Sequence, residues 1–273
     1  MQDSRRLNWF GQTDRGRIRK NNEDSFLAIQ FDARETHYLG KIGDASLGHY
    51  DYVFAVSDGM GGEKAGEFAS RITVETIARL LPRSYQQTAV GLSVGFEDVF
   101  IELFDQVHQA LMRYGGSYDE CAGMGATLSL CWFTPDRMYF GHIGDSRIYH
   151  LPAGGGIQQI SHDDTHVGWL YRNAKLNERE ARTHPRRNVL QRALGAGHQF
   201  VSPQVGALDL AAGDSVLLCS DGLVEGLFDS QILELIRTPA PPASELNIAQ
   251  RLIHAAIGGA TKDNITALVV EIV

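Results

Sequence analysis

Short apolar segments recur along the chain and predict β-strands, because a strand buried on one face alternates and one buried on both faces is apolar throughout. Residues 127–133 alternate, whereas residues 215–219 and 265–273 are almost entirely apolar. The predicted strands are 25–31, 52–56, 127–133, 138–143, 147–151, 215–219 and 265–273. The three residues 144–146, Gly-Asp-Ser, join two of these strands and indicate a hairpin turn.

Three longer segments carry apolar residues at three-to-four spacing and predict amphipathic helices, each covering a flat surface with one face. They are residues 63–81, residues 96–114 closed by Gly115 and Gly116, and a helix from the N-cap Ser244 to Gly258 and Gly259. Residues 167–187 are polar and mixed, which indicates a flap with a short helix beginning near Asn177. This pattern predicts an α+β fold, with a core of sheet packed on sheet and helices outside.

Length and composition narrow the class of protein. The 273 residues can bury one sizeable core, and no repeat or long linker divides them, so we expect a single domain over 1–273. A formal net charge of -8 argues against a nucleic-acid partner, because the nucleic-acid backbone binds to a basic face. Three cysteines without a C-x-x-C pair indicate reduced thiols. With no signal peptide and no apolar run of roughly 18 residues, the sequence predicts a cytoplasmic protein that does not bind membranes.

Acidic residues stand where the strand-like segments meet turns. They are Glu23, Asp24, Asp58, Asp145, Asp221 and Asp263. Taken singly, each would be an ordinary turn or cap residue. If they converge they repel one another, since two unit charges ~4 Å apart cost about 4 kcal/mol at an effective dielectric of ~20. Such a cluster needs cations or protons, and ligation by oxygen alone favours Mg²⁺ or Mn²⁺ over Zn²⁺.

Short motifs surround these acids in a fixed order. They are RKNNED at 19–24, DGMGG at 58–62 followed by Gly66 and Glu67, GDSR at 144–147, NVLQRALG at 188–195, SDG at 220–222 and DNIT at 263–266. In this order they resemble the PPM family, the type 2C protein phosphatases, and the DGMGG form resembles its bacterial branch. The resemblance extends from Asp14 to the last residue. It implies two central antiparallel sheets flanked by helix pairs, with a flap near the active site.

The resemblance also implies a centre of two or three Mn²⁺ or Mg²⁺ ions. Asp58 would bridge two metals, and the Gly59 carbonyl would bind one of them. Asp221 and Asp263 would complete the first metal site, and Glu23 would help to hold the second. Asp58 and Asp221 would contribute to catalysis indirectly, through the water molecule that bridges the metals they hold.

Three further residues take roles from the same resemblance. Asp24 would orient metal-bound water, Asp145 with Asp221 would form a third and looser metal site, and Arg19 would hold the substrate phosphate. The implied reaction is the hydrolysis of phosphoserine and phosphothreonine by direct attack of a metal-bridging hydroxide. A bridging water loses its proton near neutral pH, because its pKa falls from about 15.7 to about 7. The implied partners are phosphorylated proteins, the targets of a serine/threonine kinase, and we expect a monomer.

Several positions depart from the family pattern, and none is an expected metal ligand. Met60 stands where eukaryotic members often carry a histidine proposed as general acid, so the leaving group must be protonated by water or another group. Asp164 replaces a usual histidine and His142 a usual asparagine, while Gln191 and Ala126 each replace a usual threonine. The insertion from Asp32 to Asp51 is long for the bacterial branch, and the sequence assigns it no role.

Three other functions compete with this interpretation. A pseudophosphatase that only binds phosphoproteins would have lost a metal-site aspartate, and all are present. A small-molecule phosphomonoesterase would use the same centre, and comparing phosphopeptides with sugar phosphates would distinguish it. Cys131 and Arg137 have the C-x5-R spacing of cysteine phosphatases, but Cys131 lies in a predicted strand, and Trp132, Phe133 and Pro135 do not suit a phosphate loop.

Overall fold

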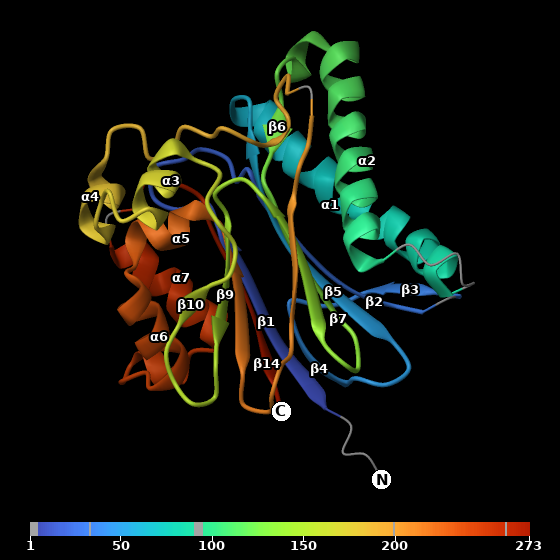
Figure 1. Ribbon diagram of the computed structural model, residues 1–273. Helices are drawn as coiled ribbons and strands as arrows, with labels where there is room; N and C mark the ends of the chain where they lie inside the picture. The colour runs from blue at the N-terminus through green and yellow to red at the C-terminus, as the bar shows by residue number, and fades with distance from the viewer. Residues whose placement is uncertain (1–4, 33, 90–94, 199, 260) are drawn as a thin grey trace.

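Two antiparallel β-sheets pack face to face at the centre of the molecule (Figure 1). The computed structural model describes residues 5–32, 34–89, 95–198, 200–259 and 261–273. In the first sheet the order is β10 (Gln158–Gln159), β9 (Arg147–Leu151), β13 (Ser215–Cys219), β14 (Ile265–Ile272), β1 (Arg6–Asp14) and β4 (Ile42–Ser46). In the second it is β11 (Leu194–Gly195), β6 (Gly125–Ala126), β5 (Asp51–Met60), β7 (Leu128–Phe133), β8 (Met138–Ile143) and β12 (Gln204–Leu208). The strand β2 (Asp24–Phe31) pairs with β5 and with β3 (Thr36–Tyr38).

Helices cover the outer face of each sheet (Figure 1). The second sheet carries α1 (Glu63–Ala89) and α2 (Phe96–Ser117), and the first carries α5 (Asp221–Gly226), α6 (Asp229–Arg237) and α7 (Ile248–Gly258). The flap contains α3 (His166–Arg172) and α4 (Glu178–Thr183), and 3₁₀ turns lie at Asp119–Cys121 and Ala243–Glu245. None of the helices in the described ranges combines the length and apolarity that crossing a bilayer requires. This arrangement is the predicted α+β sandwich flanked by helices.

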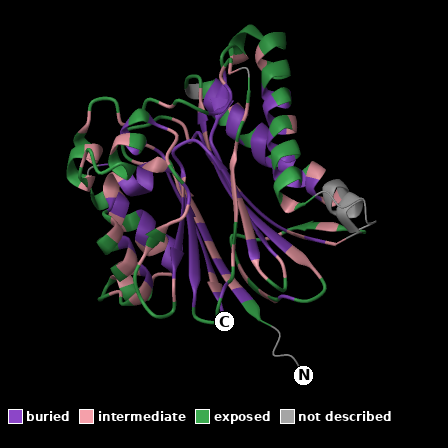
Figure 2. Ribbon diagram, in the orientation of Figure 1, coloured by how far each residue is buried: buried purple, intermediate pink, exposed green. Residues whose placement is uncertain are grey.

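The alternation of side chains along each strand divides the interior into three apolar layers (Figure 2). On β5, Phe54 and Val56 face the other sheet, while Val53 and Ala55 face the layer under α1 and α2. Because both faces of the central strands are covered, their sequences read as continuous apolar runs. The predicted strands at 215–219 and 265–273 are confirmed on this basis, as β13 and β14.

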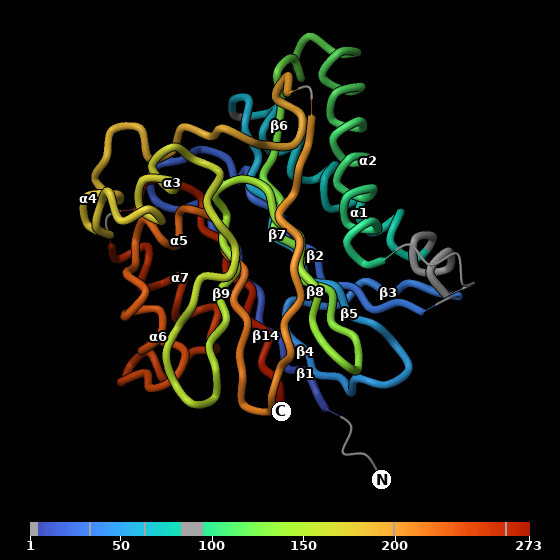
Figure 3. The backbone as a smooth tube through the Cα atoms, in the orientation of Figure 1, coloured from blue at the N-terminus to red at the C-terminus, as the bar shows by residue number. Residues whose placement is uncertain are grey.

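The predicted hairpin at residues 144–146 is wrong. β8 pairs with β7 and β12, whereas β9 pairs with β13 and β10, so the chain crosses from one sheet to the other at Asp145 (Figure 3). Gly144 makes this crossing with φ +110°, and a Cβ on it would lie 2.5 Å from the Thr127 side chain. A short Gly-Asp-Ser connection looks the same in sequence whether or not the flanking strands pair.

Two predicted helix ends also differ. α2 continues through Gly115 and Gly116 to Ser117. α7 begins after Asn247, whose side chain accepts from the Gln250 amide at 2.9 Å, so the cap is Asn247 rather than Ser244. The flap helix does begin at Asn177, through the same kind of reciprocal capping. The insertion after Asp32 forms β3 and β4, one at an edge of each sheet.

Candidate metal centre

The predicted acidic residues meet at one end of the sandwich, where strands of both sheets stop. Burial raises the pKa of Asp58 well above its usual value, and the charges on four other aspartates raise it further. In order of effect these are Asp24, Asp221, Asp145 and Asp263. Residues from β2, β5, the β8–β9 crossing, α5 and the turn before β14 therefore share one electrostatic site, as the sequence predicts.

Asp58 and Asp24 lie opposite one another in the antiparallel register of β5 and β2. The Asp58 amide donates to Thr127 Oγ1 at 3.0 Å, which fixes the end of β5. Asp24 Oδ2 accepts from Ser220 Oγ and Thr266 Oγ1, each at 2.7 Å. Burial nevertheless dominates these hydrogen bonds and raises the pKa of Asp24 to about 6.

Asp145 and Asp221 lie on the flap side of the site. Burial, and next the charge of Asp163, raise the pKa of Asp145 to about 7. Burial, and next the charge of Asp145, raise the pKa of Asp221 well above its usual value. Asp221 is the first residue of α5, so its backbone position is set by the start of that helix.

Two buried carboxylate oxygens, Asp24 Oδ1 and Asp221 Oδ1, have no hydrogen-bond partner. Buried polar atoms in folded proteins are nearly always paired, because an unpaired one costs about 1–3 kcal/mol. Unpaired, mutually repelling carboxylate oxygens fit a hard divalent cation, which binds oxygen and cancels the charge. The donor set of this centre therefore suits Mg²⁺ or Mn²⁺.

Glycines bring Glu23 against the end of β5. The Gly59 amide donates to the Glu23 carbonyl at 3.1 Å. A Cβ on Gly59 would lie 1.9 Å from the Gly66 carbonyl oxygen, and one on Gly66 would lie 2.3 Å from Glu23 Oε2. The glycines of the DGMGG motif and the following Gly66 thus allow β5, the first turn of α1 and the Glu23 carboxylate to touch.

Arg19 reaches the centre from a loop between β1 and β2. Its Nη2 donates to Asp263 Oδ2 at 2.6 Å, and the Arg19 side chain is half exposed to solvent. In this conformation no three acidic, histidine or cysteine side chains among the described residues lie close enough together to hold an ion. Arg19 instead supplies positive charge to Asp263.

Asn264 holds this loop in place, a role that the sequence does not reveal. Its Nδ2 donates to the carbonyls of Arg15 and Asn21, at 2.9 and 2.8 Å, and its Oδ1 accepts from the Glu23 amide at 2.8 Å. A Cβ on Gly222 would lie 2.0 Å from the Asn264 carbonyl oxygen. One asparagine beside Asp263 therefore holds the Glu23 backbone and, at Arg15 and Asn21, the loop that carries Arg19.

Asp164 and His142 secure the crossing that carries Asp145. The Gly144 amide donates to Asp164 Oδ2 at 3.1 Å, and the Asp164 amide donates to the Gly144 carbonyl at 2.7 Å. His142 Nε2 lies 3.1 Å from the same carbonyl, and its Nδ1 lies 2.8 Å from Ser129 Oγ. The two departures from the family pattern thus contact one peptide group.

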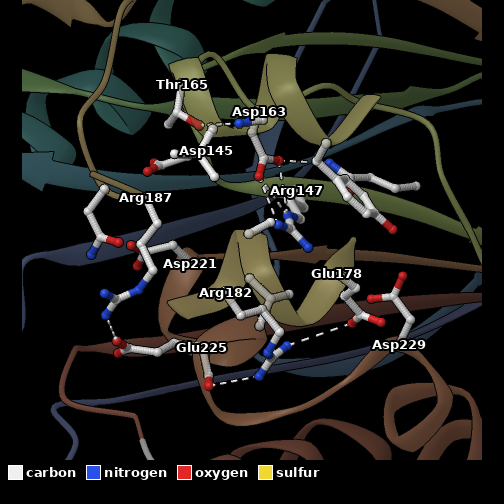
Figure 4. A pocket seen from close by; sticks show the side chains of 17 residues that line it. Asp145, Arg147, Asp163, Thr165, Glu178, Arg182, Arg187, Asp221, Glu225 and Asp229 are labelled. Atoms are coloured by element: carbon white, nitrogen blue, oxygen red, sulfur yellow. Dashed lines mark hydrogen bonds and ion pairs between the residues drawn. The ribbon is translucent and has the colours of Figure 1, made fainter. Parts of the chain in front are cut away.

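A cavity of about 100 Å³ lies between the flap and α5, with Asp145 and Asp221 on its wall (Figure 4). From the flap, Arg182 donates to the carbonyls of Glu225 and Leu227, at 2.9 and 2.8 Å. Arg187 pairs with the Glu225 carboxylate, which also accepts from the Lys262 amide at 3.0 Å. These contacts fasten the flap beside the acidic site.

Cys131 and Arg137 do not form the phosphate-binding loop of a cysteine phosphatase. Cys131 is fully buried on β7, and burial raises the pKa of its thiol. Arg137 lies at the surface and pairs with Asp209 at 2.6 Å. All three cysteines are free thiols.

Comparisons with known proteins agree with this geometry. The family model described as protein phosphatase 2C matches residues 42–252. The serine/threonine protein phosphatase PstP of Mycobacterium tuberculosis is 34% identical over 98% of this chain, which spans 45% of PstP's length. The serine/threonine phosphatase stp of Listeria monocytogenes is 29% identical over 95% of this chain and 94% of its own.

Among solved structures, the catalytic domain of the serine/threonine protein phosphatase PstP in complex with two manganese ions superposes with a TM-score of 0.75. It is 30% identical, and the match covers 99% of this chain and all of that one. A family model matching more than two thirds of the residues, a relative above 30% identity and a shared fold lead to one conclusion. This chain belongs to the protein phosphatase 2C family.

Proposed function

We propose that this protein is a serine/threonine protein phosphatase that hydrolyses phosphoserine and phosphothreonine with two or three Mn²⁺ or Mg²⁺ ions. The observation that carries the proposal is the meeting of buried carboxylates from both sheets, two of them with unpaired oxygens. Family membership and the manganese complex of PstP support it.

Four acidic residues and one backbone carbonyl would hold the two main metal ions. Asp58 would bridge two ions with help from the Gly59 carbonyl, and Asp221 and Asp263 would complete the first site. Glu23, held against Gly66, would contribute to the second. When bound, the cations would supply positive charge for the phosphate and the activation of water for its direct hydrolysis. Asp58 and Asp221 would thus act in catalysis by holding the ions.

Asp145 and Asp221 would form a third, looser site on the flap side. Asp145 lies in the crossing between the sheets rather than within a strand, so its position depends on the contacts of Gly144 with Asp164 and His142. A ligand carried by such a connection holds an ion less rigidly than one at the end of a hydrogen-bonded strand.

Asp24 and Arg19 would handle water and phosphate. Ser220 and Thr266 hold one oxygen of Asp24 and leave Oδ1 free to accept a hydrogen bond from water at the centre. The Arg19 guanidinium, half exposed beside Asp263, would pair with the substrate phosphate. Met60 has no proton to give, so water or another group would protonate the departing alkoxide.

The experiment is a turnover assay on p-nitrophenyl phosphate and on phosphothreonine peptides, with Mn²⁺, with Mg²⁺ and after chelation by EDTA. We expect turnover only with added cation. Thiol alkylation should cause no loss, because Cys131 and Cys219 are buried and the partly exposed Cys121 lies in the 3₁₀ turn Asp119–Cys121, outside the acidic cavity. Full activity in thoroughly chelated protein would contradict the proposal. Binding of phosphopeptide without turnover would identify a pseudophosphatase, and turnover of sugar phosphates alone would identify a small-molecule phosphomonoesterase. Cytoplasmic location, a monomeric state and kinase targets as substrates remain predictions from the sequence.

A further inference from the structure

The flap is a basic segment in an acidic protein. Residues 167–187 contain six arginine and lysine residues against two glutamates, a surplus of four positive charges, whereas the whole chain carries -8. The cations are Arg172, Lys175, Arg179, Arg182, Arg186 and Arg187. The excess of acids elsewhere makes this local reversal of sign a distinct feature of the surface.

The six cations fall into two groups with different surroundings. Arg182 and Arg187 point inward and are half-buried against α5 and the residues that follow it (Figure 4). Arg182 contacts the carbonyls of Glu225 and Leu227 and the Phe228 ring, the last at 4.0 Å, and Arg187 pairs with the Glu225 carboxylate. They fasten the flap to the body of the protein. The guanidinium groups of Arg182 and Arg187 are therefore already engaged within the protein.

The outer group is exposed to solvent. Lys175, Arg179 and Arg186 form no ion pair with an acidic side chain anywhere in the described ranges, and Arg172 donates only to the Asp163 carbonyl, at 2.9 Å. Since the inner pair fixes the orientation of α4, the outer cations are held at the surface without an internal counter-charge. We call these four residues the outer basic face.

The position of the outer basic face indicates what it binds. Tyr171 and Arg187 line the cavity whose wall includes Asp145 and Asp221. Each is the chain neighbour of a residue of the outer basic face, Arg172 or Arg186, so this face lies on the segment that borders the proposed reaction centre. A polypeptide with its phosphorylated residue at the centre extends over the surrounding surface on both sides. Charges within about 10 Å of that path act on it at ~0.1 M salt.

We propose that the outer basic face binds acidic side chains, Asp or Glu, that flank the phosphorylated residue of the substrate protein. This inference rests on the proposed phosphatase function and adds a preference among phosphoproteins. Complementary charge at the rim of a site acts mainly on association and selectivity, and it weakens as salt rises. A long polyanion such as a nucleic acid would meet the negative remainder of the chain, which disfavours it.

The test compares three phosphothreonine peptides of equal length whose flanking residues are acidic, neutral or basic. kcat/KM is measured with Mn²⁺ at about 50 mM and about 500 mM NaCl, and p-nitrophenyl phosphate, which has no flanking chain, is the reference substrate. The test variant is Arg179→Glu with Arg186→Glu. The matched control is Arg113→Glu, a charge reversal at an exposed position of α2.

We expect the wild-type protein to prefer the acidic over the neutral peptide roughly 2- to 30-fold at low salt, the range for two surface charge contacts. The preference should shrink at high salt. In the double variant the ratio of acidic-peptide to p-nitrophenyl phosphate turnover should fall by a similar factor, and in Arg113→Glu it should not change. Equal use of all three peptides by active wild-type enzyme would overturn the inference and leave the phosphatase function standing. Inactivity on every substrate would overturn both.

Discussion

The substitution Asp24→Asn should make the metal-free protein more stable near neutral pH, although it removes a charge from the proposed active site. Burial raises the pKa of Asp24 to about 6 from its ordinary value of 3.8, so the folded state disfavours the ionised form. The difference corresponds to about 3 kcal/mol once the pH exceeds the folded pKa, at about 1.4 kcal/mol per pH unit. Asparagine resembles the protonated acid and can still accept from Ser220 and Thr266.

The sign of this effect depends on pH. Below about pH 3.8 the acid is protonated in both states and the variant has no advantage; the advantage grows through about pH 6 and is complete above it. Urea unfolding in EDTA at about pH 4 and about pH 7.5 measures the difference, and Asp105→Asn on the exposed side of α2 is the control. With saturating Mn²⁺ the gain should disappear, since bound cations neutralise the wild-type carboxylate. A variant less stable than wild type at pH 7.5 in EDTA would refute this reasoning, because it would mean that the two hydroxyl contacts outweigh burial.

Three other changes test individual roles. Asp221→Asn should lose most turnover and metal affinity while the fold survives, as measured by calorimetric titration with Mn²⁺, kinetics and circular dichroism; near-normal turnover would remove it from the centre. Arg19→Ala should mainly raise KM, by roughly 10- to 150-fold for one charge-assisted contact, and an unchanged KM would place the phosphate elsewhere. Asp145→Ala should keep two tightly bound ions while turnover of phosphopeptides falls. Loss of both tight ions would make Asp145 a ligand of the main pair, and unchanged turnover would make it structural.

The sequence predicts those helices and strands whose residue pattern lies within the element itself. The central strands are apolar because both faces are covered, and the acids at their ends interrupt that pattern sharply enough to be recognised. The sequence around Gly144 predicts a hairpin where the chain in fact crosses between the sheets, because the three residues 144–146 do not show which strands pair. The strand β1 was not predicted at all, although Leu7 and Trp9 are buried in it, because its polar residues interrupt the apolar pattern.

The supporting contacts of the site are harder to predict than the ligands. Asn264 binds the loop of Arg15 and Asn21 from the far end of the sequence, and no periodicity relates such distant positions. Thr127 and Ser220 look like ordinary strand and turn residues until the sheets are packed. The motif DNIT contains Asn264, yet the backbone atoms that its side chain holds become evident only in three dimensions.

The place of β14 in the first sheet has a consequence for how the protein is made. This strand, the last described in sequence, lies between β13 and β1, and the turn before it carries Asp263 and Asn264. During synthesis, β13 and β1 therefore lack the strand that lies between them until β14 emerges, and the Arg19 loop lacks its contacts with Asp263 and Asn264. Competence to bind metal should therefore appear only after Asp263 and β14 have been made, so that shorter nascent chains do not trap ions in a partial site.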